Sequence, residues 1–272
     1  MDLETLCSGI DLQPEMQGQV LRYYHSDDYH KVQAAARGLQ SMETEAETRK
    51  ELNQLFQTDA KHIKMLTCML ACAVELYPWY REKGISDTIF FETMRCFSRF
   101  IGECKQRTGE YSFDREWWTA RQISGRLFRL GELEYEMLSE QGKPVVSMHI
   151  PSNAVLTPQK CDESIGLAKR FFAEHFPKFQ DVDYVCDSWL LSPELPSLLP
   201  PDSNILAFQK RFQLQKADAS DTAYIEWVFK TDSSRVEDYP EDSTLQRNMK
   251  AHLLSGGKIG SGQGVLIRVS GR

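Results

Sequence analysis

The spacing of apolar residues changes near residue 110, and this change constrains the fold more than any other feature of the 272-residue chain. Before that point apolar residues recur three and four positions apart, as Met16, Val20 and Tyr24 do, which is the spacing of an amphipathic helix. Residues 63–80 are apolar on nearly all sides, which indicates a buried central helix. We therefore expect residues 1–112 to form a helical bundle domain.

After residue 112 the pattern is mixed. Residues 127–137 alternate as a strand does, and the turn residues 141–144 can lead that strand into a second one over 145–150. The later segments predict helices over 162–175, 204–212 and 243–254 and strands over 183–191, 213–216, 223–229 and 265–269. This order favours a mixed β-sheet flanked by helices over residues 113–272, so the chain as a whole is expected to be of the α+β class.

Charge and cysteine content exclude several classes of protein. The net charge of -7 provides no basic face for phosphates, so nucleic acid is not an expected partner. The seven cysteines are odd in number, and Asp2 and Glu4 stand where a signal peptide would be positively charged, so we expect reduced thiols in the cytoplasm. No apolar run approaches the ~20 residues that cross a bilayer, and a membrane partner is not expected.

Residues 186–212 are the most informative stretch for function. They read as an apolar strand that ends in polar groups, a loop rich in proline, and a helix with a polar cap. Ligands of α/β proteins collect where a strand leads to a helix N-terminus. The free N–H groups of that helix could hold an anion, and the residues expected to contact a bound cofactor there are Leu190, Leu191, Ser192, Ser203, Asn204 and Ile205. The alternative for Ser203 is a role as helix cap alone.

Two further segments offer groups for anions. Arg121 and Arg126 can bind phosphate through their forked guanidinium groups, or they can instead pair with glutamates on neighbouring strands. The glycine-rich residues 256–264 resemble a phosphate loop in composition but follow a helix, so we interpret them as a helix C-cap and a connection.

Several motifs spread along the chain resemble those of bacterial acyltransferase-domain-containing proteins. The residues that carry the resemblance are Trp117-Trp118, Arg121-Gln122, Gly125 to Gly131, His149-Ile150-Pro151, Cys186 to Leu191, Ser203-Asn204-Ile205, Phe208-Gln209 and Thr244 to Arg247. That family pairs an N-terminal helical domain with a C-terminal GNAT-like domain. The resemblance therefore implies a GNAT-like fold in the second domain and acetyl-CoA or another acyl-CoA as co-substrate.

The resemblance also implies where the co-substrate binds. In GNAT folds acyl-CoA lies where two parallel strands splay apart, and the following helix holds its pyrophosphate. The strand expected to end at Leu191 and the helix expected to open at Ser203 take these places here. The glycine-rich loop typical of GNAT proteins is absent from residues 192–203, which puts CoA binding at this loop in question.

Acyl transfer to an amine needs a base for the proton and a donor for the oxyanion or the leaving thiolate. Candidates on or beside the predicted central strands are Asp187, Ser188, His149 and Glu226, with Asp187 as first choice. Cys186 is an alternative as covalent nucleophile, although a buried structural thiol is the more common role of a free cysteine.

Two functions follow from these observations. The first is an acyl-CoA-dependent N-acyltransferase whose amine acceptor, not identified by the sequence, attacks directly. The second is a non-catalytic ligand-binding or regulatory protein on a GNAT-like scaffold, which the missing glycine loop favours. Cys68 and Cys72 have no histidine at a zinc-ligand spacing, so we expect no metal. The sequence does not predict an oligomeric state.

Overall fold

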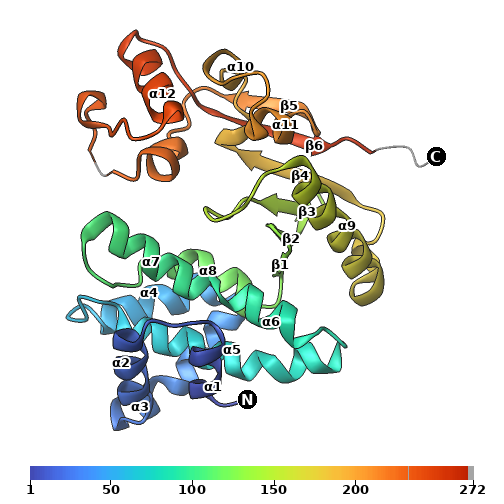
Figure 1. The fold of residues 1–272 in the computed structure, drawn as a ribbon. Coiled ribbons are helices and arrows are strands. Elements are labelled where there is room, and N and C mark those ends of the chain that lie inside the picture. The colour runs from blue at the N-terminus through green and yellow to red at the C-terminus, as the bar shows by residue number, and fades with distance from the viewer. Residues whose placement is uncertain (232, 269–272) are drawn as a thin grey trace. The chain divides into compact units, whose positions relative to one another are not determined.

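The protein divides into two compact units, Met1–Arg129 and Leu130–Arg272, in a computed structural model that describes residues 1–231 and 233–268. The first unit is helical and the second contains a mixed sheet with helices, so the predicted α+β class is confirmed (Figure 1). The domain boundary expected after residue 112 stays a prediction, because the division into compact units does not test which segments fold independently.

The first unit is built from helices, as the apolar spacing predicted. Their bounds are α1 Leu3–Gly9, α2 Pro14–Tyr24, α3 Asp27–Ala36, η1 Arg37–Gln40, α4 Glu45–Leu55, α5 Ile63–Glu82, α6 Asp87–Met94, α7 Cys96–Thr108 and α8 Glu116–Ile123. Helix α5 packs against α1, α2, α3, α6 and α8. This central position explains why α5 is apolar on nearly all sides, because neighbours cover each of its faces.

Polar caps set where several of these helices begin. The side chains of Asp2, Ser26 and Ser86 each accept a hydrogen bond from a backbone N–H in the first turn that follows, at 2.8, 3.2 and 3.4 Å. At the other end, Gly109 terminates α7 with a φ of 84°, a left-handed conformation that glycine adopts without strain.

The sheet and its helices follow β1, which spans the division between the units. The bounds are β1 Leu127–Leu130, β2 Leu133–Glu140, β3 Lys143–His149, α9 Pro158–His175, η2 Pro177–Phe179, β4 Asp183–Ser188, η3 Trp189–Leu191, α10 Leu195–Leu198, α11 Asn204–Gln209, β5 Phe212–Asp218, η4 Ile225–Phe229, η5 Val236–Asp238, α12 Thr244–Leu254 and β6 Ser261–Leu266. The strand order is β1-β2-β3-β4-β6-β5, in which β3 and β4 are parallel and the pairs β2/β3, β4/β6 and β6/β5 are antiparallel.

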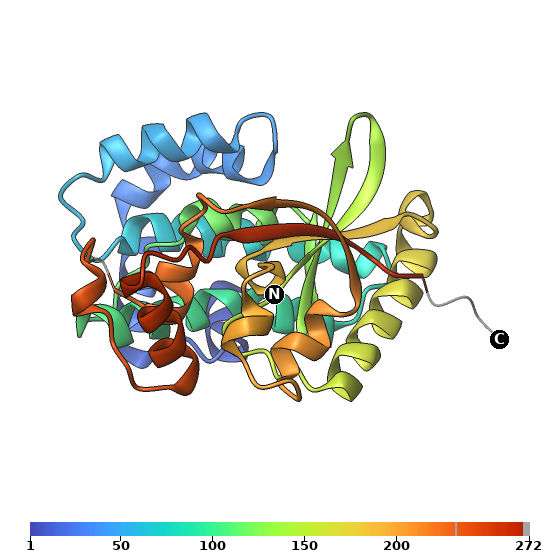
Figure 2. The same cartoon turned by 90° about the horizontal axis from the view of Figure 1, so that it is seen from above.

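The predicted hairpin forms, but one of its strands is interrupted. Gln141 and Gly142, both with positive φ, connect β2 to β3 as the sequence indicated. Residues 127–137 are not one strand, because Gly131 turns the chain between β1 and β2 with a φ of 70°. A Cβ at Gly131 would lie 3.3 Å from the Cβ of Ser164. Figure 2 shows the hairpin extending away from the other strands, in agreement with the exposure of residues 139–144.

Helix α9 covers one face of this sheet. The ring of Phe172 on α9 lies 6.3 Å from that of Tyr184 on β4, and the hydroxyl of Ser164 lies 3.0 Å from that of Tyr135 on β2. Side chains alternate across a strand, so Cys186 shares the face of Tyr184 and points toward α9. The opposite face of β4 carries Val185 and Asp187.

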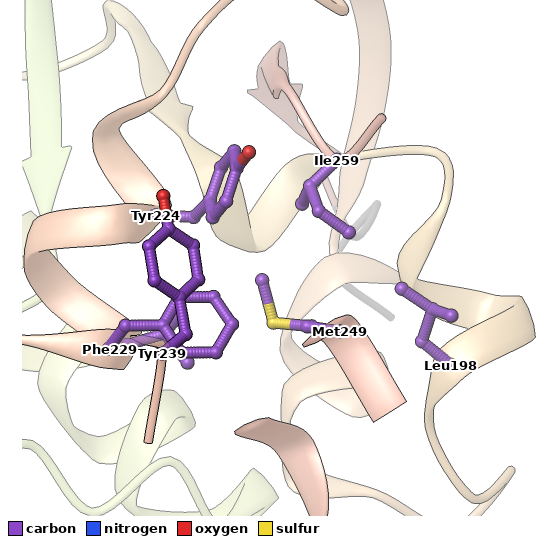
Figure 3. Close-up of a cluster of buried hydrophobic side chains, with 7 residues drawn as sticks. Leu198, Tyr224, Phe229, Tyr239, Met249 and Ile259 are labelled. Atoms are coloured by element: carbon purple, nitrogen blue, oxygen red, sulfur yellow. The ribbon is translucent and has the colours of Figure 1, made fainter. Parts of the chain in front are cut away.

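An insertion over residues 219–260 separates β5 from β6 and forms a small core together with Leu198 of α10. Figure 3 shows this cluster, which consists of Leu198, Tyr224, Val228, Phe229, Tyr239, Met249 and Ile259. The expected strand over 223–229 is wrong: residues 225–229 form a π-helix whose Val228 and Phe229 fill this core. A short apolar run fits a buried helix and a strand equally well, and here the packing decides.

Two strand ends also differ from expectation. The strand expected over 183–191 ends at Ser188, and the next three residues form a 3₁₀ turn. The final strand, expected over 265–269, runs from Ser261 to Leu266, so half of the glycine-rich segment is a strand rather than a connection. Residue 269 lies outside the described residues. In the part of the chain that the structure describes, no helix is long and apolar enough to span a membrane.

The close approach of η3 to β6 predicts a position that tolerates only glycine. A Cβ at Gly262 would lie 2.3 Å from the carbonyl oxygen of Leu191. We expect Gly262→Ala to lower the free energy of unfolding by about 1–3 kcal/mol, the usual cost of overpacking. The matched control is Gly166→Ala on α9, where the nearest atom is 3.5 Å away and alanine favours the helix. Urea denaturation should show a lower midpoint for the first variant only; equal midpoints would contradict the packing.

Candidate active site

The parallel pair β3 and β4 separates at its carboxyl end. The register of the pair runs Val145↔Asp183, Val146↔Tyr184 and Ser147↔Val185, after which the two strands are no longer partners. Strand β4 nevertheless stays paired with β6 as far as Ser188↔Gly262. The last residues of β3 stay paired with β2, as far as Glu134↔His149, so the sheet opens between β3 and β4. The backbone groups that face each other across this opening become available to a ligand.

The register places two candidate residues on opposite sides of this opening. Two positions beyond the last pair stand His149 on β3 and Asp187 on β4. Alternation along each strand puts both side chains on the sheet face that α9 does not cover. Both had been predicted as catalytic candidates, and the structure brings their strand positions into register.

His149 is held by a carboxylate that the sequence reasoning missed. Its Nε2 lies 2.9 Å from Oε2 of Glu136, whose side chain is only 4% exposed. An ionised carboxylate can only accept, so this contact favours the tautomer of His149 in which Nε2 carries the hydrogen. Hairpin register would have revealed the pair: Glu136 faces Ser147 and is therefore the diagonal neighbour of His149.

Asp187 has an unusual electrostatic environment. As a residue it is exposed, yet partial burial of its carboxyl group raises the pKa above the ordinary value, and the charges of Asp221 and Asp218 add to this while Lys216 opposes it. Among the described residues, none forms a hydrogen bond or ion pair with its carboxylate. Asp218 is the last residue of β5 and pairs with Ser261 at the same end of the sheet, and Asp221 follows in the segment after β5.

The other catalytic candidates occupy less favourable positions. Cys186 is fully buried on the α9 side, and burial, followed by the charge of Asp187, raises the pKa of its thiol, which disfavours the thiolate. Ser188 accepts a hydrogen bond from the N–H of Leu190 at 3.2 Å, which leaves its own O–H as a donor. Glu226 lies half-buried in the π-helix rather than on a strand. The roles of all three stay predictions.

The residues expected to bind the cofactor after β4 have structural contacts. Leu190 and Leu191 are buried, and the buried hydroxyl of Ser192 donates to the carbonyl of Ile259 at 2.5 Å. Ser203 is the N-cap of α11, accepting from the N–H of Ile205 at 3.2 Å. Asn204, the first residue of this six-residue helix, is exposed. Their contacts to a cofactor stay predictions.

The helix that follows β3, the first strand of the separating pair, is α9 and not α11. The chain leaves β3 at His149 and enters α9, an 18-residue helix capped by Thr157, whose hydroxyl accepts from the N–H of Lys160 at 3.4 Å. The first N–H groups of such a helix lack partners within it and favour an anion. Periodicity along the chain does not reveal the parallel pairing of β3 with β4, so this loop could not be predicted from the sequence.

Arg121 and Arg126 belong to the first unit. The guanidinium of Arg121, on α8, lies 4.5 Å from the ring centre of Trp118 and donates to the carbonyl of Trp117 at 2.9 Å. Arg126 follows α8 and is half-buried. Their role in cofactor binding stays a prediction. No group of three or more potential metal-ligating acids, histidines or cysteines gathers within residues 1–231 and 233–268.

Comparison with known families supports this architecture. A family model described as the GNAT-like C-terminal domain matches residues 127–266, and one described as the N-acyltransferase N-terminal domain matches residues 1–125. The protein belongs to this two-domain family. The resemblance seen in the sequence motifs is thereby confirmed. No curated protein sequence matches the chain.

Solved structures show the same fold. An acyltransferase in complex with decanoyl-CoA and teicoplanin aligns with a TM-score of 0.82 at 22% identity, covering 96% of this chain and 86% of that one. An acyltransferase in complex with decanoyl-CoA aligns with a TM-score of 0.79 at 23% identity and the same coverage. A third, a mutant in complex with octanoyl-CoA, has a TM-score of 0.81 at 20% identity, again covering 96% and 86%.

The environment of Asp187 predicts a pH-dependent gain on its neutralisation. A carboxyl pKa that folding raises means that the folded state holds the proton more tightly, so ionisation at neutral pH opposes folding. Asp187→Asn should therefore raise the melting temperature at pH 7. The gain in the free energy of unfolding should be less than about 1 kcal/mol, because solvent screens the charge. The gain should vanish below the ordinary aspartate pKa of about 4.

Thermal unfolding across pH values checks this expectation. Asp183→Asn, at the other end of β4, serves as control, because that carboxylate accepts from Arg268 at 2.9 Å and its loss should bring no gain. A melting temperature of Asp187→Asn at or below the wild-type value at pH 7 would contradict the proposed electrostatics.

Proposed function

We propose that the protein is an acyl-CoA-dependent N-acyltransferase that binds its donor between the separating ends of β3 and β4. The observation that carries this proposal is the end of parallel pairing at Ser147 and Val185 while both strands continue. An acyl-CoA has a long pantetheine arm with amide groups, and such an arm can pair with the strand edges that the opening exposes.

The diphosphate of the donor then belongs at the β3–α9 loop. This loop leaves β3 directly at the opening, and α9 presents its N-terminal N–H groups there with the positive end of an 18-residue helix dipole. Residues 150–157 contain no glycine, as residues 192–203 do not, so any approach of a phosphate must use loop N–H groups flanked by side chains.

Related structures support the choice of donor and acceptor class. Acyltransferases of this fold have been solved with decanoyl-CoA, with octanoyl-CoA, and with CoA and an acylated teicoplanin. We infer that the donor is a medium-chain acyl-CoA and that the acceptor is an amine carried by a bulky small molecule.

His149 is suited to act as the base. In direct transfer the acceptor nitrogen attacks the thioester carbonyl, the nitrogen loses a proton, and the C–S bond breaks to leave CoA thiolate, which takes up a proton. Nδ1 of His149 can accept the first proton, and the buried carboxylate of Glu136 stabilises the imidazolium that results. The same proton can pass to the departing thiolate, which balances the reaction.

Asp187 and Ser188 complete the arrangement on the other strand. The unpaired carboxylate of Asp187 is suited to attract an acceptor ammonium group to the opening, and Asp187 remains the alternative base. The hydroxyl of Ser188 can donate to the oxyanion or to the thiolate. Direct attack needs no enzyme nucleophile, in keeping with the buried thiol of Cys186.

The donor can be identified by thermal stability in the presence of CoA and acyl-CoAs of two to twelve carbons. A ligand at about 100 times its Kd adds roughly 2.7 kcal/mol to the stability of the folded state. We expect a saturable rise in melting temperature that is largest for a medium chain. Absence of any rise would favour the second function, a non-catalytic binding protein, which the missing glycine loop suggests.

The base can be tested by steady-state release of CoA from the preferred donor with a panel of amines that includes teicoplanin. His149→Gln should lower kcat about 10²- to 10⁴-fold, the range for loss of a general base, with an unchanged Kd for the donor. Glu136→Gln should lower kcat less, because the imidazole remains. If His149→Gln keeps the wild-type kcat and Asp187→Asn loses activity, Asp187 is the general base instead.

A further inference from the structure

Glu132 makes a contact that the proposed donor site leaves unexplained. It lies in the turn between β1 and β2, and its Oε2 accepts a hydrogen bond from the backbone N–H of Val155 at 2.9 Å. Its Oε1 lies 3.6 Å from Nζ of Lys160. The side chain is 18% exposed, so this carboxylate is largely withdrawn from solvent.

The backbone N–H of Val155 and the ammonium of Lys160 are of kinds that bind phosphate in other proteins. Val155 lies in the β3–α9 loop and Lys160 in the first turn of α9, next to the cap Thr157. A backbone N–H before a helix and a lysine ammonium together form a typical binding arrangement for a phosphate oxygen. The carboxylate of Glu132 accepts from the N–H of Val155 and forms an ion pair with Lys160, so the two groups lie near one negative charge.

We propose that Glu132 occupies the position of the donor's diphosphate in the ligand-free protein and is displaced when acyl-CoA binds. This proposal rests on the proposed function, because it takes the β3–α9 loop as the diphosphate site. On displacement the N–H of Val155 and the ammonium of Lys160 pass from the carboxylate to the diphosphate. No covalent bond is made or broken in this exchange.

The exchange makes Glu132 a specificity-determining residue. A small anion such as inorganic diphosphate must compete with an intramolecular carboxylate, whose effective concentration is high. Acyl-CoA has additional binding energy from its pantetheine and acyl chain and can displace the carboxylate. The site therefore rejects free phosphates and accepts the whole donor.

The competing explanation is that Glu132 only braces the loop. Under that explanation Glu132 stays in place when the donor binds, and its replacement loosens the loop and weakens binding. Under displacement, its replacement removes a competitor and strengthens binding. The two explanations thus predict opposite signs for one measurement.

The experiment is calorimetric titration of wild type, Glu132→Gln and Glu163→Gln with decanoyl-CoA and with decanoyl-pantetheine, which lacks the diphosphate. Glu132→Gln should bind decanoyl-CoA about tenfold more tightly, because a like charge is removed next to the phosphates, and decanoyl-pantetheine unchanged. Inorganic diphosphate should also bind the variant more tightly. Glu163→Gln, an exposed position on α9 that accepts from Gln159, should match wild type with every ligand.

Lys160→Gln provides a second test that does not depend on the folding of the first variant. Displacement predicts weaker binding of decanoyl-CoA and unchanged binding of decanoyl-pantetheine. If wild type binds decanoyl-CoA but Glu132→Gln binds it no more tightly, displacement is overturned and the proposed function stands. If wild type binds neither ligand, the proposed function itself fails, and displacement fails with it.

Discussion

The end of hydrogen bonding between β3 and β4 is the constraint on which the candidate site depends. Each strand is held on its other side: β2 pairs with β3 as far as His149, and β6 pairs with β4 as far as Ser188. Glycine at 262 lets η3 pack directly on β6, because a Cβ there would lie 2.3 Å from the carbonyl oxygen of Leu191. Because both strands continue in the sheet while their mutual pairing ends, two facing edges remain that a ligand can occupy.

The chemistry of the opening follows from which side chains this geometry collects. Register and alternation place His149 and Asp187 on one sheet face, and hairpin pairing places Glu136 beside His149. A buried carboxylate is costly unless it has a partner, so the contact with His149 at 2.9 Å stabilises both groups. Among residues 1–231 and 233–268, none provides such a partner for Asp187, which suits a group that meets a cationic acceptor.

The sequence predicted the two-part organisation and the hairpin, because apolar spacing and the Gln141-Gly142 turn are local signals. It did not predict which helix follows the first splayed strand, since parallel pairing of β3 with β4 joins segments separated by a whole helix. The strand expected over 223–229 is a π-helix at residues 225–229, because Phe229 packs against Tyr239 in a small core. The connection expected over the glycines of β6 is a strand that packs against Leu191. The diagonal pair of Glu136 with His149 needed the exact register.

Hydrogen–deuterium exchange of the protein with and without a bound medium-chain acyl-CoA tests the central claim most directly. The account predicts slower exchange in two segments, residues 148–160 at the end of β3 and the start of α9, and residues 185–190 at the end of β4. It predicts no change over residues 203–209 of α11. Protection confined to α11, with the ends of β3 and β4 unaffected, would contradict it.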